Sequence, residues 1–127
     1  MHFQYFYDSP KGRYTFYRIP KQLFSDKCFS TLSADAKLLY GILLDRMELS
    51  VQNDWKDSIG RIYIYYPVEE IKRTFCCSND KAVRMLGELD STKGIGPVEV
   101  VRQGQGKPNR IYVRQLSEDT FQTEQTR

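Results

Sequence analysis

Residues 67–116 constrain the fold more than any other part of this 127-residue chain. Apolar residues recur at helical spacing from Pro67 to Cys76, and proline suits the first position of a helix. Ser78 is a suitable N-cap for a second helix, which we predict over Asn79–Leu89. Two short helices joined by so short a turn form the helix-turn-helix layout.

Two strand-like runs follow the second helix, Val98–Gln103 and Arg110–Leu116, and a loop rich in glycine joins them. They predict a β-hairpin with a flexible tip. Residues 98–116 hold four arginine or lysine residues against Glu99 alone, a net charge of +3. A basic hairpin is typical of a surface that contacts phosphates.

The part of the chain before these helices supplies the expected core and one addition. Aromatic-rich runs at Phe3–Tyr7 and Arg13–Ile19 favour two strands around a turn, an N-terminal β-hairpin. We expect a buried helix over Ala34–Met47 with Ser33 as its N-cap, then a surface loop over Ser50–Gly60.

Residues 61–66 alternate aliphatic and aromatic side chains as a strand does. The order helix, strand, helix, turn, helix, hairpin is that of a winged helix. The fold class predicted is therefore α+β: a winged helix-turn-helix with an additional N-terminal β-hairpin. Residues 1–116 form one domain in this prediction.

Composition excludes several classes of function. His2 is the only histidine and there are three cysteines, so we expect no disulfide framework, no metal site and no cofactor. No apolar run approaches the roughly 20 residues of a membrane span, and the start lacks the features of a secretory signal. We therefore expect a cytoplasmic protein without membrane contact.

The second helix of the pair is the expected DNA-reading element. Lys81, Arg84 and Glu88 are spaced to form one outward stripe. Arginine and lysine can hydrogen-bond guanine, and asparagine can hydrogen-bond adenine. The alternative is a solvated helix face on which Glu88 pairs with Arg84. The hairpin could contact phosphates or the minor groove, or could carry polar residues only to stay soluble. The candidate DNA-binding residues are Ser78, Asn79, Asp80, Lys81, Arg84, Arg102, Gln105, Lys107, Asn109 and Arg110.

Other chemistry-bearing residues favour structural interpretations. Cys76 and Cys77 lie at the turn between the two helices, where a cysteine is more often a small core residue than a reactive thiol. Trp55 lies in a polar loop and is interpreted as a partial lid over the core, with partner contact as the alternative. The carboxylate pairs lack a nearby histidine or phosphate loop, so we expect no enzyme activity.

Several spaced motifs together resemble one known family. They are Phe16–Lys21, Leu32–Gly41, Leu44–Met47, Lys81–Val83, Leu89–Asp90, Lys93–Gly96 and Gly106–Val113. The chain resembles the N-terminal domain of the RepA_N family, replication initiator protein A of plasmids and mobile elements in low-GC Gram-positive bacteria. The resemblance extends from about Tyr5 to Leu116.

The resemblance implies binding to repeated double-stranded DNA sites at a replication origin, as a homodimer. It also implies a separate C-terminal domain that recruits host replication proteins, with residues 117–127 as the start of the linker. The N-terminal hairpin, Phe3–Ile19, is the candidate dimerisation element. Initiators that nick DNA use a tyrosine and a metal held by paired histidines, which His2 alone cannot supply.

Two alternatives stay open at this point. A winged-helix transcriptional repressor would share the DNA-binding surface and differ only in its DNA site. A winged-helix protein-interaction module, acting through Trp55 and the aromatic hairpin, would lack salt-dependent DNA affinity.

Overall fold

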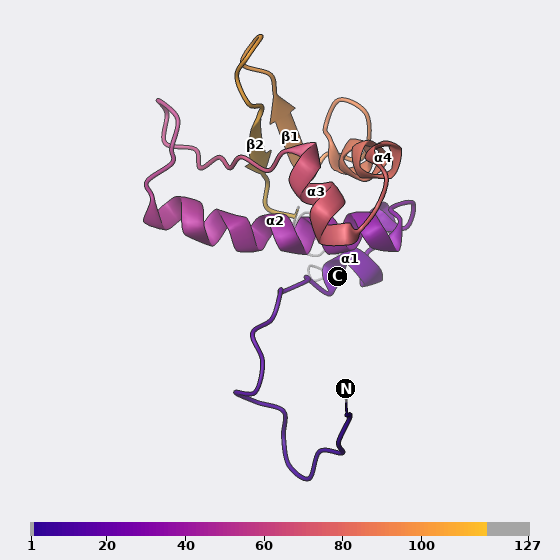
Figure 1. The fold of residues 1–127 in the computed structure, drawn as a ribbon. Coiled ribbons are helices and arrows are strands. Elements are labelled where there is room, and N and C mark those ends of the chain that lie inside the picture. The colour runs from indigo at the N-terminus through magenta and orange to yellow at the C-terminus, as the bar shows by residue number, and fades with distance from the viewer. Residues whose placement is uncertain (1, 117–127) are drawn as a thin grey trace, which may run out of the picture.

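The computed structural model describes residues 2–116, and Figure 1 shows their arrangement around one long helix. Four α-helices, a 3₁₀ turn and one two-stranded antiparallel sheet make up the fold, so the predicted α+β class is confirmed. In chain order the elements are α1 Gln22–Ser25, the 3₁₀ turn Lys27–Phe29, α2 Ala34–Gln52, α3 Val68–Phe75, α4 Asn79–Leu89, β1 Val98–Val101 and β2 Arg110–Val113.

Helix α2 is the centre of the core, as predicted. Its N-cap is Ser33, whose hydroxyl accepts a hydrogen bond from the backbone N–H of Ala36 at 3.1 Å. Leu39 and Leu43 are fully buried on its inner faces. The helix runs on to Gln52, beyond the predicted end at Met47. Residues 50–52, predicted as the start of a surface loop, form its last turn, where Ser50 is fully buried although Leu49 and Val51 are half-exposed. Tertiary contact at Ser50 therefore extends the helix beyond its apolar pattern.

Helices α3 and α4 form a tight pair beside α2 (Figure 1). Helix α3 ends where Cys76 takes a left-handed conformation, with φ of 50°. The Ser78 hydroxyl then accepts from the Lys81 backbone N–H at 3.2 Å and starts α4. The bounds of α4 agree with the prediction because both its cap and its apolar spacing are local signals.

The two strands of the hairpin pair with Val98 opposite Val113 and Val101 opposite Arg110. Both strands are shorter than the predicted runs. The expected strand over residues 61–66 is an extended segment with one bridge to β2, where the backbone groups of Ile64 and Ile111 exchange two hydrogen bonds of 2.9 Å. Both isoleucines are buried, so this bridge joins the sheet to the core.

The predicted N-terminal hairpin is wrong. Within residues 2–19 no strand pairing is present, and the segment is an extended arm that projects away from the body (Figure 1). One turn bends it, where the Arg13 N–H donates to the Pro10 carbonyl at 3.1 Å. Phe3 and Tyr7 are 88% and 93% exposed. Strand propensity did not suffice because a lone two-stranded ribbon is only marginally stable without an apolar face to pack on.

No helix in the described part of the chain is both long enough and apolar enough to cross a membrane.

Candidate functional site

Helix α4 presents three different faces. Ala82, Met85 and Leu89 are at most 1% exposed and pack into the core. A flank faces the N-terminus of α2, where the Lys81 ammonium lies 3.1 Å from an Asp35 carboxylate oxygen. The remaining face is turned to solvent. The core and α2 together therefore fix how the helix is rotated about its axis.

Glu88 lies on the flank that faces α2. Its carboxylate accepts two hydrogen bonds of 2.8 Å, one from the Ser33 backbone N–H and one from the Ser33 hydroxyl. The predicted stripe of Lys81, Arg84 and Glu88 is thus divided, because its two outer members contact α2. Glu88 does not pair with Arg84, as the alternative interpretation had proposed.

The solvent face of α4 carries Asn79, Asp80, Val83 and Arg84, all exposed. Within residues 2–116 the polar side chains of this set make no hydrogen bond or ion pair. The Ser78 hydroxyl, by contrast, is used as the helix cap. Of the helix candidates, Asn79, Asp80 and Arg84 are therefore free to meet a ligand.

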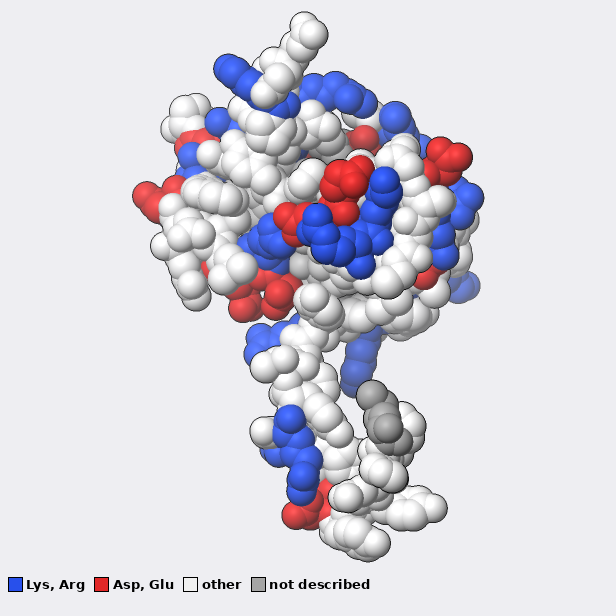
Figure 2. Space-filling model, viewed as in Figure 1, with Lys and Arg blue, Asp and Glu red and all other residues white. Residues whose placement is uncertain are grey.

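Four of the five hairpin candidates lie at or beside the tip between β1 and β2 and are exposed. They are Arg102, Gln105, Lys107 and Asn109. The tip is closed by the Gln103 side-chain amide, which donates to the Pro108 carbonyl at 2.8 Å. Gly104 and Gly106 have φ of 110° and 79°, which glycine adopts without strain. Figure 2 shows lysine and arginine side chains around this projecting end of the molecule.

Arg110 is the exception among the hairpin candidates. Its guanidinium lies over the Tyr63 ring, 4.3 Å from the centroid, and the residue is half-buried. Hydrogen bonding to Tyr112 and then to Tyr65 raises the pKa of Arg110 above its ordinary value. The side chain is thus held in an aromatic cluster rather than extended toward solvent.

The same aromatic cluster accounts for the position of the Trp55 side chain. Its ring lies 6.4 Å from the Tyr63 ring, stacked on it, and 5.3 Å from the Tyr65 ring, edge-on. Trp55 is half-buried among these tyrosines, which agrees with the interpretation as a lid. Aromatic pairs of this kind contribute about 0.5–1.5 kcal/mol beyond their buried area.

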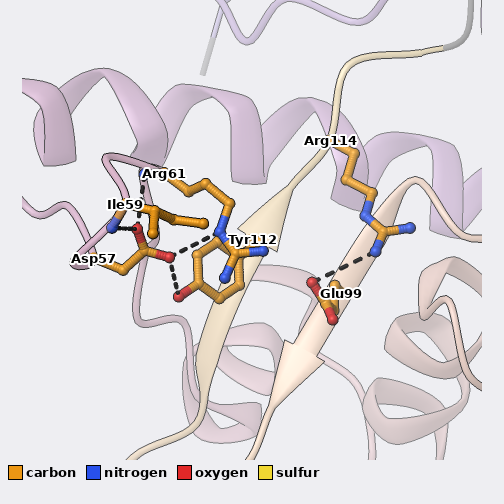
Figure 3. A network of polar contacts seen from close by, with 6 residues as sticks. All are labelled: Asp57, Ile59, Arg61, Glu99, Tyr112 and Arg114. Atoms are coloured by element: carbon orange, nitrogen blue, oxygen red, sulfur yellow. Dashed lines mark hydrogen bonds and ion pairs between the residues drawn. The ribbon is translucent and has the colours of Figure 1, made fainter.

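Asp57 anchors the loop before this cluster to β2 (Figure 3). Its carboxylate accepts from the Ile59 and Arg61 backbone N–H groups at 3.1 and 2.8 Å, from Arg61 Nε at 2.8 Å and from the Tyr112 hydroxyl at 3.0 Å. Burial raises the pKa of Asp57, but the hydrogen bonds, those from Arg61 foremost, outweigh it and lower the pKa to about 2.

A groove of about 240 Å³ separates the hairpin tip from the helix pair. Lys107 and Asn109 line it on the hairpin side, and Val68 of α3 and Leu86 of α4 line it on the helix side. The structure therefore places two of the hairpin candidates across one groove from α4.

Arg73, exposed in the last turn of α3, is a further basic residue that sequence analysis did not select. The adjacent pair Lys72 and Arg73 was its only signal.

The two adjacent cysteines differ from each other. Cys77 packs against the core, as expected, whereas Cys76 is exposed in its left-handed turn. In the described residues no group of three or more histidine, cysteine, aspartate or glutamate side chains could hold a metal ion.

These features define a small helix-and-sheet domain in which the solvent face of α4 and a basic hairpin tip are both open, with a groove between the tip and the helix pair. The chain belongs to the family described as replication initiator protein A (RepA) N-terminus, whose sequence model matches residues 15–126. This confirms the resemblance found from the sequence motifs.

Individual relatives agree with the family match. The chain is 30% identical over 110 residues to a 41 kDa protein of Lactobacillus helveticus, a match that covers 82% of this chain and 30% of that protein. The chain therefore spans less than a third of the length of this curated relative.

Solved structures extend the likeness to the fold. A structure described as a Rep-DNA complex is 31% identical, with a TM-score of 0.72 and coverage of 97% of this chain and 95% of that one. The N-terminal domain of a DNA binding protein is 30% identical, with a TM-score of 0.70 and coverage of 98% and 95%. A structure described as an MDR initiator is 29% identical, with a TM-score of 0.66 and coverage of 97% and 98%.

Proposed function

We propose that this chain is a winged-helix domain that binds double-stranded DNA at the repeats of a plasmid or mobile-element origin. Helix α4 enters the major groove, and the hairpin of β1 and β2 is the wing that contacts phosphates beside it. The observation that carries the proposal is the solvent face of α4, where Asn79 and Arg84 are free while the neighbouring Lys81 is held by Asp35.

Each named contact follows from the chemistry of the residue. Arg84 and Asn79 offer donors and acceptors suited to guanine and adenine edges. Arg102 and Lys107 at the wing supply positive charge for phosphates, and Gln105 and Asn109 add uncharged donors. The family match and the likeness to a Rep-DNA complex support DNA as the ligand.

Three of the candidate DNA-binding residues have indirect roles in this proposal. Ser78 acts by positioning α4 through its cap, and Lys81 acts by holding α4 against α2. Arg110 stiffens the base of the wing from within the aromatic cluster. Asp80 stays a candidate for accepting a hydrogen bond from cytosine. The domain binds and positions DNA and performs no catalysis in this proposal.

The assembly is also proposed. The arm over residues 2–18 exposes several aromatic rings that nothing in the described domain covers, and we infer that they are buried in a homodimer. Whole initiators of this kind would add a C-terminal domain that recruits host replication proteins. Residues 117–127, which lie outside the described part, would begin the linker to it.

Fluorescence anisotropy with labelled duplexes tests the DNA-binding proposal. We expect tight binding to origin repeats, weaker binding to a scrambled duplex, and loss of affinity as salt rises. Arg84→Ala should weaken binding to the repeats by about 5-fold to 150-fold, the range of one good base contact. Lys27→Ala, an exposed basic residue outside the proposed surface, is the matched control. Equal, salt-independent signals on both duplexes would instead favour a protein-interaction module. The exposed aromatic rings of the arm are the observation that supports this alternative.

A further inference from the structure

Gly87 lies inside α4, half-buried, at helical spacing from the exposed Val83 and Arg84, where glycine is a poor choice for helix stability. A Cβ built at this position would meet no atom within 4 Å. Gly41 in α2 is different, because a Cβ there would lie 2.7 Å from Ile19 Cγ1 and 3.0 Å from the Arg18 carbonyl oxygen. Packing within the described domain therefore explains Gly41 and does not explain Gly87.

Val83 lies one helical turn before Gly87 on the same face. It is 46% exposed, although α4 buries its other large apolar residues wholly or in part. A β-branched residue on a solvated helix face helps neither helix propensity nor burial. Val83 and Gly87 thus form a short apolar strip, with the free side chains of Asn79 and Arg84 beside it.

We propose that this strip is where α4 comes closest to the base pairs, and that Val83 determines specificity by contacting the 5-methyl group of a thymine. This inference rests on the proposed DNA-binding function and deepens it. Gly87 provides the clearance that lets the helix approach the groove floor, since any side chain there would project from the same face. Apolar contact with the thymine methyl is the way in which an aliphatic side chain distinguishes thymine in the major groove.

The test of Val83 uses a duplex recovered by selection from a random pool, with each thymine replaced singly by deoxyuridine. Wild-type protein should lose about 4-fold in affinity at one particular thymine, the equivalent of one methyl group removed from a contact. Val83→Ala should bind the thymine duplex less tightly by a similar factor and should not distinguish deoxyuridine from thymine at that position. If the two losses multiply, or if no single thymine matters to the wild type, the assignment of Val83 is wrong.

The test of Gly87 separates folding from binding. Gly87→Ala should raise the thermal midpoint of the free domain, because alanine favours the helix and meets no neighbour. The same variant should bind the selected duplex at least about 10-fold less tightly, because the added methyl group keeps the helix from its closest approach. A stabilised variant that binds as well as the wild type would overturn the inference while leaving the DNA-binding proposal intact. Failure of the wild type to prefer the selected duplex over a scrambled one would overturn both.

Discussion

The link between Glu88 and Ser33 offers the sharpest test of how α4 is held. Glu88→Ala removes the two 2.8 Å hydrogen bonds that the carboxylate accepts from Ser33, and it removes a negative charge at the N-terminus of α2. Nothing else in the core is disturbed, because Glu88 is only half-buried. The variant therefore measures the contact between α4 and the start of α2.

The expected loss in the free energy of unfolding follows from the number and the exposure of these hydrogen bonds. A hydrogen bond to a charged group contributes about 1.5–3 kcal/mol when well shielded, and Ser33 is exposed, so we assign about 0.5–1 kcal/mol to each. The charge at the helix N-terminus adds about 0.3–1 kcal/mol. Glu88→Ala should thus lower the free energy of unfolding by about 2 kcal/mol and the thermal midpoint by about 8 °C.

Urea and thermal unfolding followed by circular dichroism measure this change. Glu88→Gln keeps an acceptor but loses the charge, so about half of the effect should remain. A double-mutant cycle with Ser33→Ala should give a coupling of about 0.5–1 kcal/mol, because only the bond to the hydroxyl is lost in that background while the backbone N–H still donates. Glu48→Ala, exposed on α2, is the control and should change stability by less than about 0.5 kcal/mol.

Two results would contradict a stabilising link between Glu88 and Ser33. A Glu88→Ala variant as stable as the wild type would mean that the two hydrogen bonds do not exceed the solvation that they replace. Fully additive effects of Glu88→Ala and Ser33→Ala would mean that the side chains do not interact in solution.

Three further predictions concern the core and the response to pH. Leu43→Ala, at a fully buried position of α2, should lower the free energy of unfolding by about 3–4 kcal/mol in urea titration, and a loss below about 1 kcal/mol would contradict the assigned core. Burial raises the pKa of Tyr40 to about 12, so stability is complete below pH 10 and falls as the pH rises toward 12. The loss should be about 2 kcal/mol. Unfolding of Tyr40→Phe followed across that pH range should show a smaller loss, and an unchanged loss would contradict the role of Tyr40. The lowered pKa of Asp57 acts in the opposite direction, so stability is complete above about pH 4 and is lost as the pH falls toward 2. Unfolding of Asp57→Asn followed across that range should show a flatter acid limb, and an unchanged limb would exclude Asp57 as its source.

The helix pair and the hairpin could be predicted because their signals are local. Ser78 caps α4 through a backbone group three residues away, and the apolar spacing of the helix marks its buried face. The end of α2 at Gln52 and the absence of strand pairing within residues 2–19 could not be predicted from local signals. Both depend on whether a segment finds an apolar surface to pack on, and local propensity does not report that.

Local sequence signals therefore fixed the bounds of α4 and the family, that of RepA initiators. They placed the start of α3 one residue early, because Pro67 is its extended N-cap and Val68 its first residue. Which polar side chains stay free depends instead on the tertiary contacts. Glu88 meets Ser33 across 55 residues of sequence, and Arg110 lies over the ring of Tyr63 from a distant segment. Such pairings depend on how α2 and the sheet are placed against α4. The same placement leaves the face with Val83 and Gly87 uncovered, so this open face is defined only in the folded chain.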